Sequence, residues 1–173
     1  MALVGTETFQ VIGLAANGQR AGQFESATFG SPITPVAAGA ALTLTAAKGC
    51  LTVLLNTAAG SVVTLPAATG SGLTYKFVVS TTTTSGAHKI LAASSSDFIN
   101  GLAVGENANT CKAFASAAAT NHSIQMPFSG SQPSGGFIGD WFEITDIAAN
   151  LWQANGLYQA GTTPTTPFSS ATS

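Results

Sequence analysis

The sequence predicts an all-β protein, an antiparallel β-sandwich of jelly-roll type with an extended N-terminal arm and an extended C-terminal tail. From residue 50 onward, apolar and polar residues alternate over short segments, and turn-forming residues separate these segments. No convincing amphipathic helix lies between them, and such a pattern is typical of sandwiches and barrels. We expect the arm to cover residues 1–45, the sandwich 46–160 and the tail 161–173.

Eight segments carry the strand pattern. In Leu73–Val79 the two-residue period places the apolar side chains on one face and Thr74 and Lys76 on the other, as in a half-buried strand. The remaining predicted strands are Cys50–Leu55, Ser61–Leu65, Ala87–Ala92, Asp97–Val104, His122–Met126, Phe137–Ile147 and Leu151–Ala154.

Turn and helix signals complete the secondary-structure prediction. Asn100-Gly101 and Asn155-Gly156 are dipeptides that tight hairpin turns prefer, because both central residues must accept a positive φ. The alanine-rich segment Thr110–Thr120 is the one helix candidate. Its alternative is an ordered loop of small residues across one end of the sandwich. Near the N-terminus, Thr8–Ile12 can pair with a later strand through a turn at Asn17-Gly18.

The two ends of the chain differ in composition from the predicted sandwich. Residues 24–47 contain Pro32, Pro35 and many small residues, and the tail Gly161–Ser173 has two prolines, repeated threonine and no charge. Such segments favour extended structure. We therefore expect both ends to lie across the surface of another molecule and to become ordered on binding.

Charged side chains are scarce, at 7% of 173 residues, against about 25% in an ordinary domain. The net charge is only −2, whereas disorder requires a high net charge, so we expect one folded domain. No apolar run approaches the ~20 residues that span a bilayer, and the N-terminus lacks a secretory signal's basic region. A membrane partner is therefore not expected, and neither is a nucleic-acid partner, because the basic residues form no cationic stripe. They are Arg20, Lys48, Lys76, Lys89 and Lys112.

The titratable residues form no catalytic constellation in the sequence. Among the acids only Asp140, Glu143 and Asp146 cluster, and strand parity places Glu143 on the opposite face from the other two. They cannot converge on one metal or one glycosidic bond, and we expect a solvated or turn-capping role. His88 and His122 have no neighbouring carboxylate in sequence, so we expect surface or interface packing. The other acids are Glu7, Glu25, Asp97 and Glu106.

Cysteine and glycine spacing excludes further kinds of site. Cys50 and Cys111 are far apart without a CxxC motif, which argues against a disulfide framework or a zinc site and favours partly buried thiols. Gly70-Ser71-Gly72 and Gly135-Gly136 are followed neither by a helix nor by a Lys-Ser/Thr pair, so they are not phosphate loops. The sequence thus predicts no catalytic residue, no metal and no cofactor.

Two tryptophans flank the last predicted hairpin. Trp141 and Trp152 lie on segments joined by the short Ala148-Ala149 connection, and we expect them to pack across it. A carbohydrate-binding role would instead require an exposed aromatic side chain beside several polar ones.

Four segments resemble structural proteins of tailed bacteriophages. In Val63–Val79 a VTLP strand turns through Thr-Gly-Ser-Gly into a strand ending in Phe-Val-Val, and Gly139–Asp146 with Asn150–Gly156 is similar to the closing strands of such domains. Asp97–Gly101 adds a further match. Head-decoration proteins and fibre or spike modules share this pattern. The resemblance implies a virion component with a β-sandwich, typically trimeric.

Within that group the chain is most similar to a capsid decoration, or cement, protein, because it has no shaft repeats or heptads. The resemblance implies a non-enzymatic protein made in the bacterial host cytoplasm and located on the outer surface of the capsid. There, as a homotrimer, it would bridge neighbouring subunits of the major capsid protein, with an anchoring arm in residues 1–45. The alternative is a receptor- or glycan-binding module of a tail or head fibre. A spike-type hydrolase is disfavoured, because paired acids are missing.

Overall fold

The computed structural model describes residues 34–46, 51–128 and 132–172. Their regular secondary structure consists of β-strands, and these residues contain no helix. The predicted all-β class is therefore confirmed, and each of the eight predicted strands overlaps an observed one. The strands are β1 (Val36–Ala37), β2 (Ala41–Thr43), β3 (Leu51–Leu55), β4 (Val62–Thr64), β5 (Thr74–Val79), β6 (Ala87–Leu91), β7 (Phe98–Asn107), β8 (Thr110–Ala115), β9 (Ser123–Pro127), β10 (Trp141–Ala148), β11 (Leu151–Gln159) and β12 (Phe168–Ser169).

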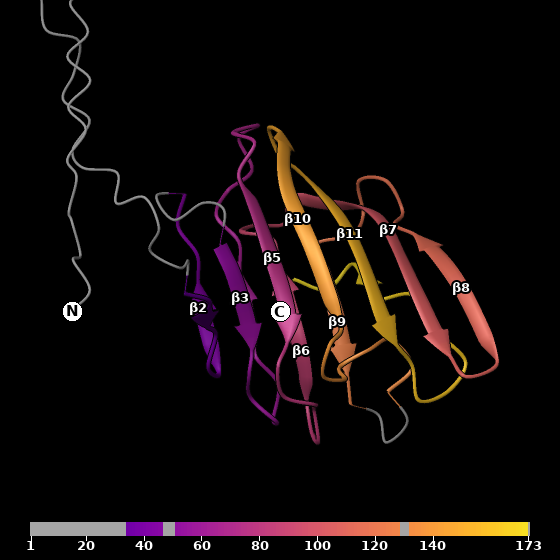
Figure 1. The fold of residues 1–173 in the computed structure, drawn as a ribbon. Coiled ribbons are helices and arrows are strands. Elements are labelled where there is room, and N and C mark those ends of the chain that lie inside the picture. Colours follow the sequence, from indigo (N-terminus) through magenta and orange to yellow (C-terminus); the bar gives the residue numbers. More distant parts are fainter. Residues whose placement is uncertain (1–33, 47–50, 129–131, 173) are drawn as a thin grey trace, which may run out of the picture. The chain divides into compact units, whose positions relative to one another are not determined.

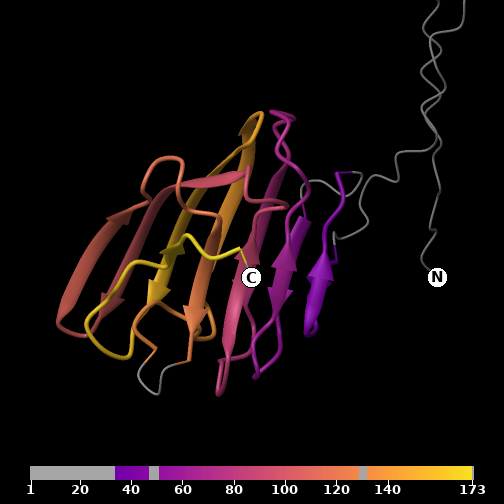
Figure 2. The ribbon, with the colours of Figure 1, turned by 180° about the vertical axis from the view of Figure 1, so that it is seen from behind.

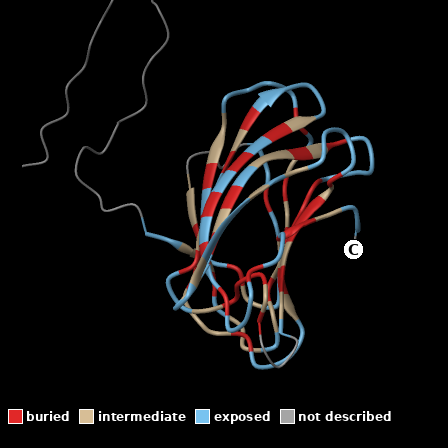
Figure 3. Ribbon diagram, turned by 90° about the vertical axis from the view of Figure 1, so that its right-hand side faces the viewer, coloured by how far each residue is buried: buried red, intermediate tan, exposed pale blue. Residues whose placement is uncertain are grey.

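The strands form two sheets that share one core. The seven-stranded sheet has the order β1-β3-β5-β10-β11-β7-β8, and the five-stranded sheet has the order β12-β9-β6-β4-β2. Figures 1 and 2 show the sheets from opposite sides, and Figure 3 shows the two layers on edge with buried residues between them. The arrangement is sandwich-like, and each sheet keeps one outer face.

Both sheets are mixed, because the first six strands alternate between them. Strands β1, β3 and β5 are parallel neighbours in the large sheet, and β2, β4 and β6 are parallel neighbours in the small one. A parallel pair needs a crossover connection, and here the crossover is a strand of the facing sheet instead of a helix. With the parallel pair β7 and β11, half of the ladders in the described residues are parallel. The expectation of an antiparallel sandwich is wrong for these pairs.

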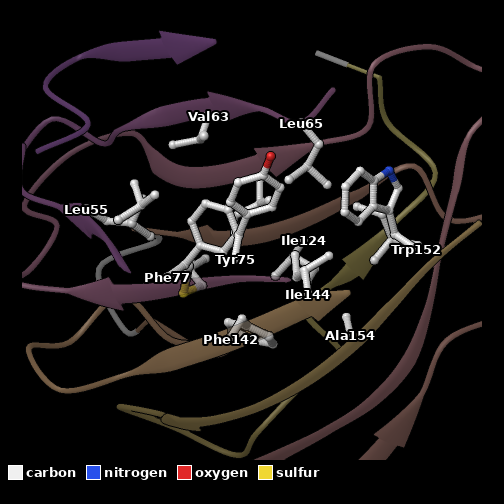
Figure 4. Packing of buried hydrophobic residues seen from close by; sticks show 14 of the residues in the cluster. Leu55, Val63, Leu65, Tyr75, Phe77, Ile124, Phe142, Ile144, Trp152 and Ala154 are labelled. Carbon is white, nitrogen blue, oxygen red and sulfur yellow. The ribbon is translucent and has the colours of Figure 1, made fainter. Parts of the chain in front are cut away.

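In-register apolar rows form the core. In the large sheet Phe77 pairs with Phe142, and the next buried row pairs Tyr75 with Ile144. Trp152 lies fully buried with its ring 6.0 Å from that of Tyr75 (Figure 4). Full burial of one such side chain contributes roughly 1.5–3 kcal/mol. One row crosses all five strands of the small sheet and consists of Leu42, Val63, Ile90, Ile124 and Phe168.

Both Asn-Gly dipeptides lie inside strands, so the predicted hairpin turns at Asn100-Gly101 and Asn155-Gly156 are wrong. These glycines permit close packing: a Cβ on Gly101 would overlap the carbonyl of Ala154, and one on Gly156 would overlap the ring of Phe142. The turn of the β10–β11 hairpin instead uses Asn150, which adopts a φ of 63°.

The helix candidate Thr110–Thr120 begins as a strand. Its first six residues form β8, which pairs antiparallel with β7 at the edge of the large sheet. Phe114 packs there on Tyr158, with ring centroids 6.5 Å apart. Pairing and aromatic packing outweigh the helix propensity of alanine, which is worth under ~1 kcal/mol per residue.

The sandwich begins before residue 46, and part of the tail belongs to it. Contacts group the chain from Thr34 onward as one compact unit, which includes β1 and β2. In the tail, β12 pairs with β9, and Phe168 is buried in the core. This part of the tail therefore packs on its own chain. The rest of the predicted arm, including Thr8–Ile12, lies outside the described residues.

Candidate functional site

Asp146, near the end of β10, fastens the loop that precedes β5. Its Oδ1 accepts the Gly70 N–H at 2.7 Å, and its Oδ2 accepts the Ser71 N–H at 3.0 Å and the Ser71 hydroxyl at 2.7 Å. Thr69 also donates both its N–H and its hydroxyl. Burial by itself raises the Asp146 pKa, but these hydrogen bonds outweigh it and lower the pKa to about 2. The carboxylate is therefore an ionised clamp, in agreement with the turn-capping role expected from the sequence.

Asp140, just before β10, fastens loops at the opposite end of the same strand. Its Oδ2 accepts the N–H groups of Gly136 and Phe137 at 2.8 and 3.0 Å, and its Oδ1 accepts the Gln159 N–H at 2.8 Å. Burial raises the pKa of Asp140 to about 6 despite these three donors. Glu143, between the two aspartates, is exposed on the other face. The three acids do not converge, as strand parity predicts.

The two histidines make structural hydrogen bonds, and the expected surface position is wrong for His88. His88 is fully buried; its Nδ1 accepts the Ser61 N–H, and its Nε2 donates to the carbonyl of Thr81, both at 3.0 Å. Burial lowers the His88 pKa, with the Thr81 bond opposing the shift, so the ring is a neutral cross-link. His122 donates from Nδ1 to the carbonyl of Asp97 at 2.8 Å. In the described residues neither ring is hydrogen-bonded to a carboxylate.

Four loops at the Asp140 end of the sandwich form one hydrogen-bonded surface. The Thr84 N–H donates to the Ala58 carbonyl at 2.8 Å, and the Thr83 N–H donates to the Gly136 carbonyl at 3.0 Å. The Gly161 N–H reaches the carbonyl of Gln132 at 3.1 Å. We call this surface the uncharged loop end, because its four segments contain no charged residue: 56–60, 80–86, 132–139 and 161–167.

Buried polar groups hold the uncharged loop end, and an apolar side chain projects from it. The side-chain nitrogen of Gln132 is buried and donates to Thr83 Oγ1 at 3.0 Å. Ile138 is 62% exposed, the highest value among the exposed large apolar side chains of the described residues. The backbone is thus fixed before any partner binds. The sequence itself shows that the four segments contain no charged residue, but it does not show that hydrogen bonds join them.

A hollow of about 460 Å³ lies on the outer face of the large sheet, over β10, β11, β7 and β8. Three apolar side chains in register, Trp141, Leu157 and Val104, line it. Beside them lies a second row of paired residues, Gln159, Glu106 and Cys111, which also line the hollow. We call it the Trp141 hollow.

The two tryptophans point to opposite faces of the large sheet. Trp152 pairs with Asp146 and lies in the core, whereas Trp141 pairs with Leu157 on the outer face. The expectation that they pack across the hairpin is therefore wrong. The Nζ of Lys76 lies 5.4 Å from the Trp141 ring centroid, a cation–π distance. Trp141 is consequently the partly exposed aromatic beside polar side chains that a carbohydrate-binding role requires.

The remaining candidates do not form a second site. Cys111 is a free, exposed thiol on β8, so the expected partial burial is wrong for it, whereas Cys50 lies outside the described residues. Among the described residues, no three His, Cys, Asp or Glu side chains are grouped so that they could hold a metal ion. No helix in the same part of the chain is long and apolar enough to cross a membrane.

Comparison with known proteins adds no relative to these observations. No family model, curated protein or solved structure matches the chain. The uncharged loop end and the Trp141 hollow are therefore the two features on which a functional assignment can rest.

Proposed function

We propose that the chain is a non-enzymatic capsid decoration, or cement, protein of a tailed bacteriophage. In this proposal it forms a homotrimer on the outer surface of the virion and bridges neighbouring subunits of the major capsid protein, which stabilises the head. The observation that carries the proposal is the uncharged loop end.

The chemistry of the loop end suits protein contacts that are repeated over a shell. The cores of protein interfaces are depleted in charge, and small uncharged side chains such as Thr, Ser and Gly let two backbones approach closely. Hydrogen bonds such as Thr83 N–H to Gly136 fix the surface in advance and reduce the entropy lost on binding. Many modest contacts then add through multivalency, so no single contact needs a high affinity.

The jelly-roll type of sandwich stays a prediction beside this proposal. Two facing sheets around one core support it. The parallel ladders, for example β3 with β5, depart from the antiparallel pattern of that fold.

A matched pair of variants tests the loop end. Ile138 and Ile147 are both exposed, at 62% and 48%; Ile138 lies in the loop before β10, and Ile147 lies near the end of β10. We expect Ile138→Asp to reduce the number of copies bound to undecorated phage heads, because the charge must be desolvated in the contact. Ile147→Asp should bind like the wild type.

The readout is the number of copies per head, determined by quantitative mass spectrometry of purified particles. Circular dichroism and the Tm verify that both variants fold. Equal binding by Ile138→Asp and the wild type would place the contact elsewhere. Greater loss with Ile147→Asp would move it to the opposite end of the sandwich.

The second candidate function is a receptor- or glycan-binding module of a tail or head fibre. The partly exposed Trp141 beside Glu106 and Gln159 favours it. The copy number in the virion separates the two candidates, because a shell component is present in hundreds of copies and a fibre component in a few dozen or fewer.

A further inference from the structure

We propose that the Trp141 hollow binds a neutral saccharide. This inference goes beyond the capsid proposal and does not depend on it, because the hollow lies mainly on the outer face of the large sheet and meets the loop end only at Gly139. A decoration protein and a fibre module could each carry such a site.

The floor of the hollow offers an apolar surface for one face of a sugar ring. Trp141 pairs with Leu157, and Leu157 pairs with Val104, so the three side chains lie side by side over adjacent strands. Leu157 is 47% exposed although it lies mid-sheet, so nothing in the described residues covers this row. An indole presents a broad π face to the aliphatic C–H groups of a pyranose.

The rim supplies hydrogen-bonding groups at a suitable spacing. Gln159 and Glu106 pair directly and lie two residues along their strands from Leu157 and Val104. Two residues of strand correspond to about 7 Å, a distance that one sugar ring bridges. A carboxylate and a carboxamide are planar acceptors for hydroxyl groups. Gly139 leaves the edge open, because a Cβ there would meet nothing within 4 Å.

The charges of the hollow select a neutral ligand. Its ionisable carboxyl groups are Glu106 and Asp140, and no basic side chain is among its lining residues. An anionic ligand would be repelled, whereas an entirely apolar one would strip water from Glu106 without replacing its hydrogen bonds. A neutral molecule with several hydroxyl groups can pack its C–H groups on the apolar floor and form hydrogen bonds with the polar rim. The volume of about 460 Å³ lies within the ~300–1,000 Å³ typical of small-molecule sites.

Lys76 does not change this selection. Its Nζ contacts the Trp141 ring, but Lys76 belongs to β5, on the opposite side of β10 from β11 in the sheet order. Lys76 is also the cross-strand partner of Glu143, so an opposite charge lies beside it. The cation therefore helps to hold the indole from the side away from Leu157.

The test is a titration of the full chain with cellotriose, maltotriose and chitotriose, with trigalacturonate as the anionic comparison. Binding is followed by saturation-transfer NMR of the sugar protons, which needs no tryptophan reporter and therefore serves the Trp141→Ala variant as well as the wild type. We expect saturable binding of at least one neutral trisaccharide with a Kd on the order of 1 mM, as for a shallow open site. Trp141→Ala should weaken it about tenfold and Glu106→Gln about threefold.

Two outer-face variants serve as controls. Glu143→Gln removes an exposed carboxylate that does not line the hollow, and Leu102→Ala removes an exposed apolar side chain outside it. Both should bind like the wild type. Glu106 is exposed, so Glu106→Gln keeps the fold and remains informative if Trp141→Ala unfolds.

Four results would overturn the proposal. They are no saturable binding of any neutral trisaccharide, a preference for trigalacturonate, equal weakening by Glu106→Gln and Glu143→Gln, and an oligomer that Trp141→Ala dissociates while no sugar binds. The last result would assign the hollow to a contact between copies of the chain. Head binding by the Ile138→Asp variant is measured separately, so failure of one proposal leaves the other standing.

Discussion

At each end of β10 a buried aspartate binds a loop, but the pKa values of the two aspartates are shifted in opposite directions. Asp140 and Asp146 are 2% and 1% exposed, and both accept backbone N–H groups from a loop. The pKa of Asp140 is nevertheless raised to about 6, whereas that of Asp146 is lowered to about 2. Asp146 receives two hydroxyl groups in addition to amides, and Asp140 receives amides alone. Asp140 lies deeper in the protein, so burial costs its ionised form more, and Asp146 also receives more donors; both differences contribute to the opposite shifts.

The same difference separates the structural roles of the two ends. Asp146 clamps a single loop against the β10–β11 hairpin. Asp140 belongs to a set of buried polar groups, with Gln132 and His88, that joins several loops. Asp140, whose ionised form is destabilised by burial, thus lies at the end of β10 that carries the preorganised uncharged loop end.

The largest expected effect is that of Asp146→Ala. It leaves the amides of Gly70 and Ser71 and two hydroxyls without their acceptor, at a cost of about 3–5 kcal/mol in the free energy of unfolding. Asp140→Ala should cost less at pH 7, because it also removes an unfavourably buried charge. Urea unfolding of both variants measures this, and an equal or larger loss at Asp140 breaks the comparison.

The next effect is the pH dependence that Asp140 causes. Its folded pKa of about 6 lies above the unfolded value of 3.8, so its contribution to stability is present below about pH 4 and is lost as pH rises through 6. The unfolding free energy of the wild type should therefore fall by about 2 kcal/mol relative to Asp140→Asn between pH 4 and pH 7. His88, whose lowered pKa favours the fold above pH 6.5, is present in both proteins, so its contribution cancels. A constant difference would contradict the raised pKa.

Asp146 should show the opposite slope at lower pH. Its folded pKa of about 2 lies below 3.8, so its stabilisation is present above about pH 4 and is lost as pH falls toward 2. The wild type should lose about 2 kcal/mol relative to Asp146→Asn over this range. Unfolding curves at several pH values between 2 and 5 give the slope, and a rise in relative stability on acidification would refute the assignment.

The smallest expected effect is at Tyr158, next to Asp140. Its hydroxyl donates to the carbonyl of Thr165 and so holds the tail on the sandwich. Tyr158→Phe should cost about 1 kcal/mol. It should also speed amide hydrogen exchange in residues 163–169 more than in the 69–72 loop that Asp146 clamps. Equal acceleration in both segments would mean that the two ends are not independent.

The sequence predicted which face of a sheet each residue occupies better than it predicted which strands are neighbours. The two-residue period located eight strands, and it placed Asp140 and Asp146 opposite Glu143 correctly. It could not predict the parallel ladders, because period two reports which face a residue occupies and not the direction of the neighbouring strand. The turn propensity of Asn-Gly was likewise overridden at Gly156, where the Phe142 ring needs the space of the missing Cβ.

The candidate sites depend on this missing information. Glu106 and Gln159 are 53 positions apart and meet only through the parallel β7–β11 ladder. The burial and donor count that set the Asp140 pKa also follow from loops joined across the fold. By contrast, the absence of charge in all four segments of the loop end is visible in the sequence itself.

Cryo-EM of the phage particle tests the decoration proposal most directly. We predict density for the sandwich at threefold or quasi-threefold positions of the shell, with the uncharged loop end and Ile138 facing the major capsid protein. Density for this chain confined to the tail, or a shell orientation in which the loop end faces solvent, would contradict it.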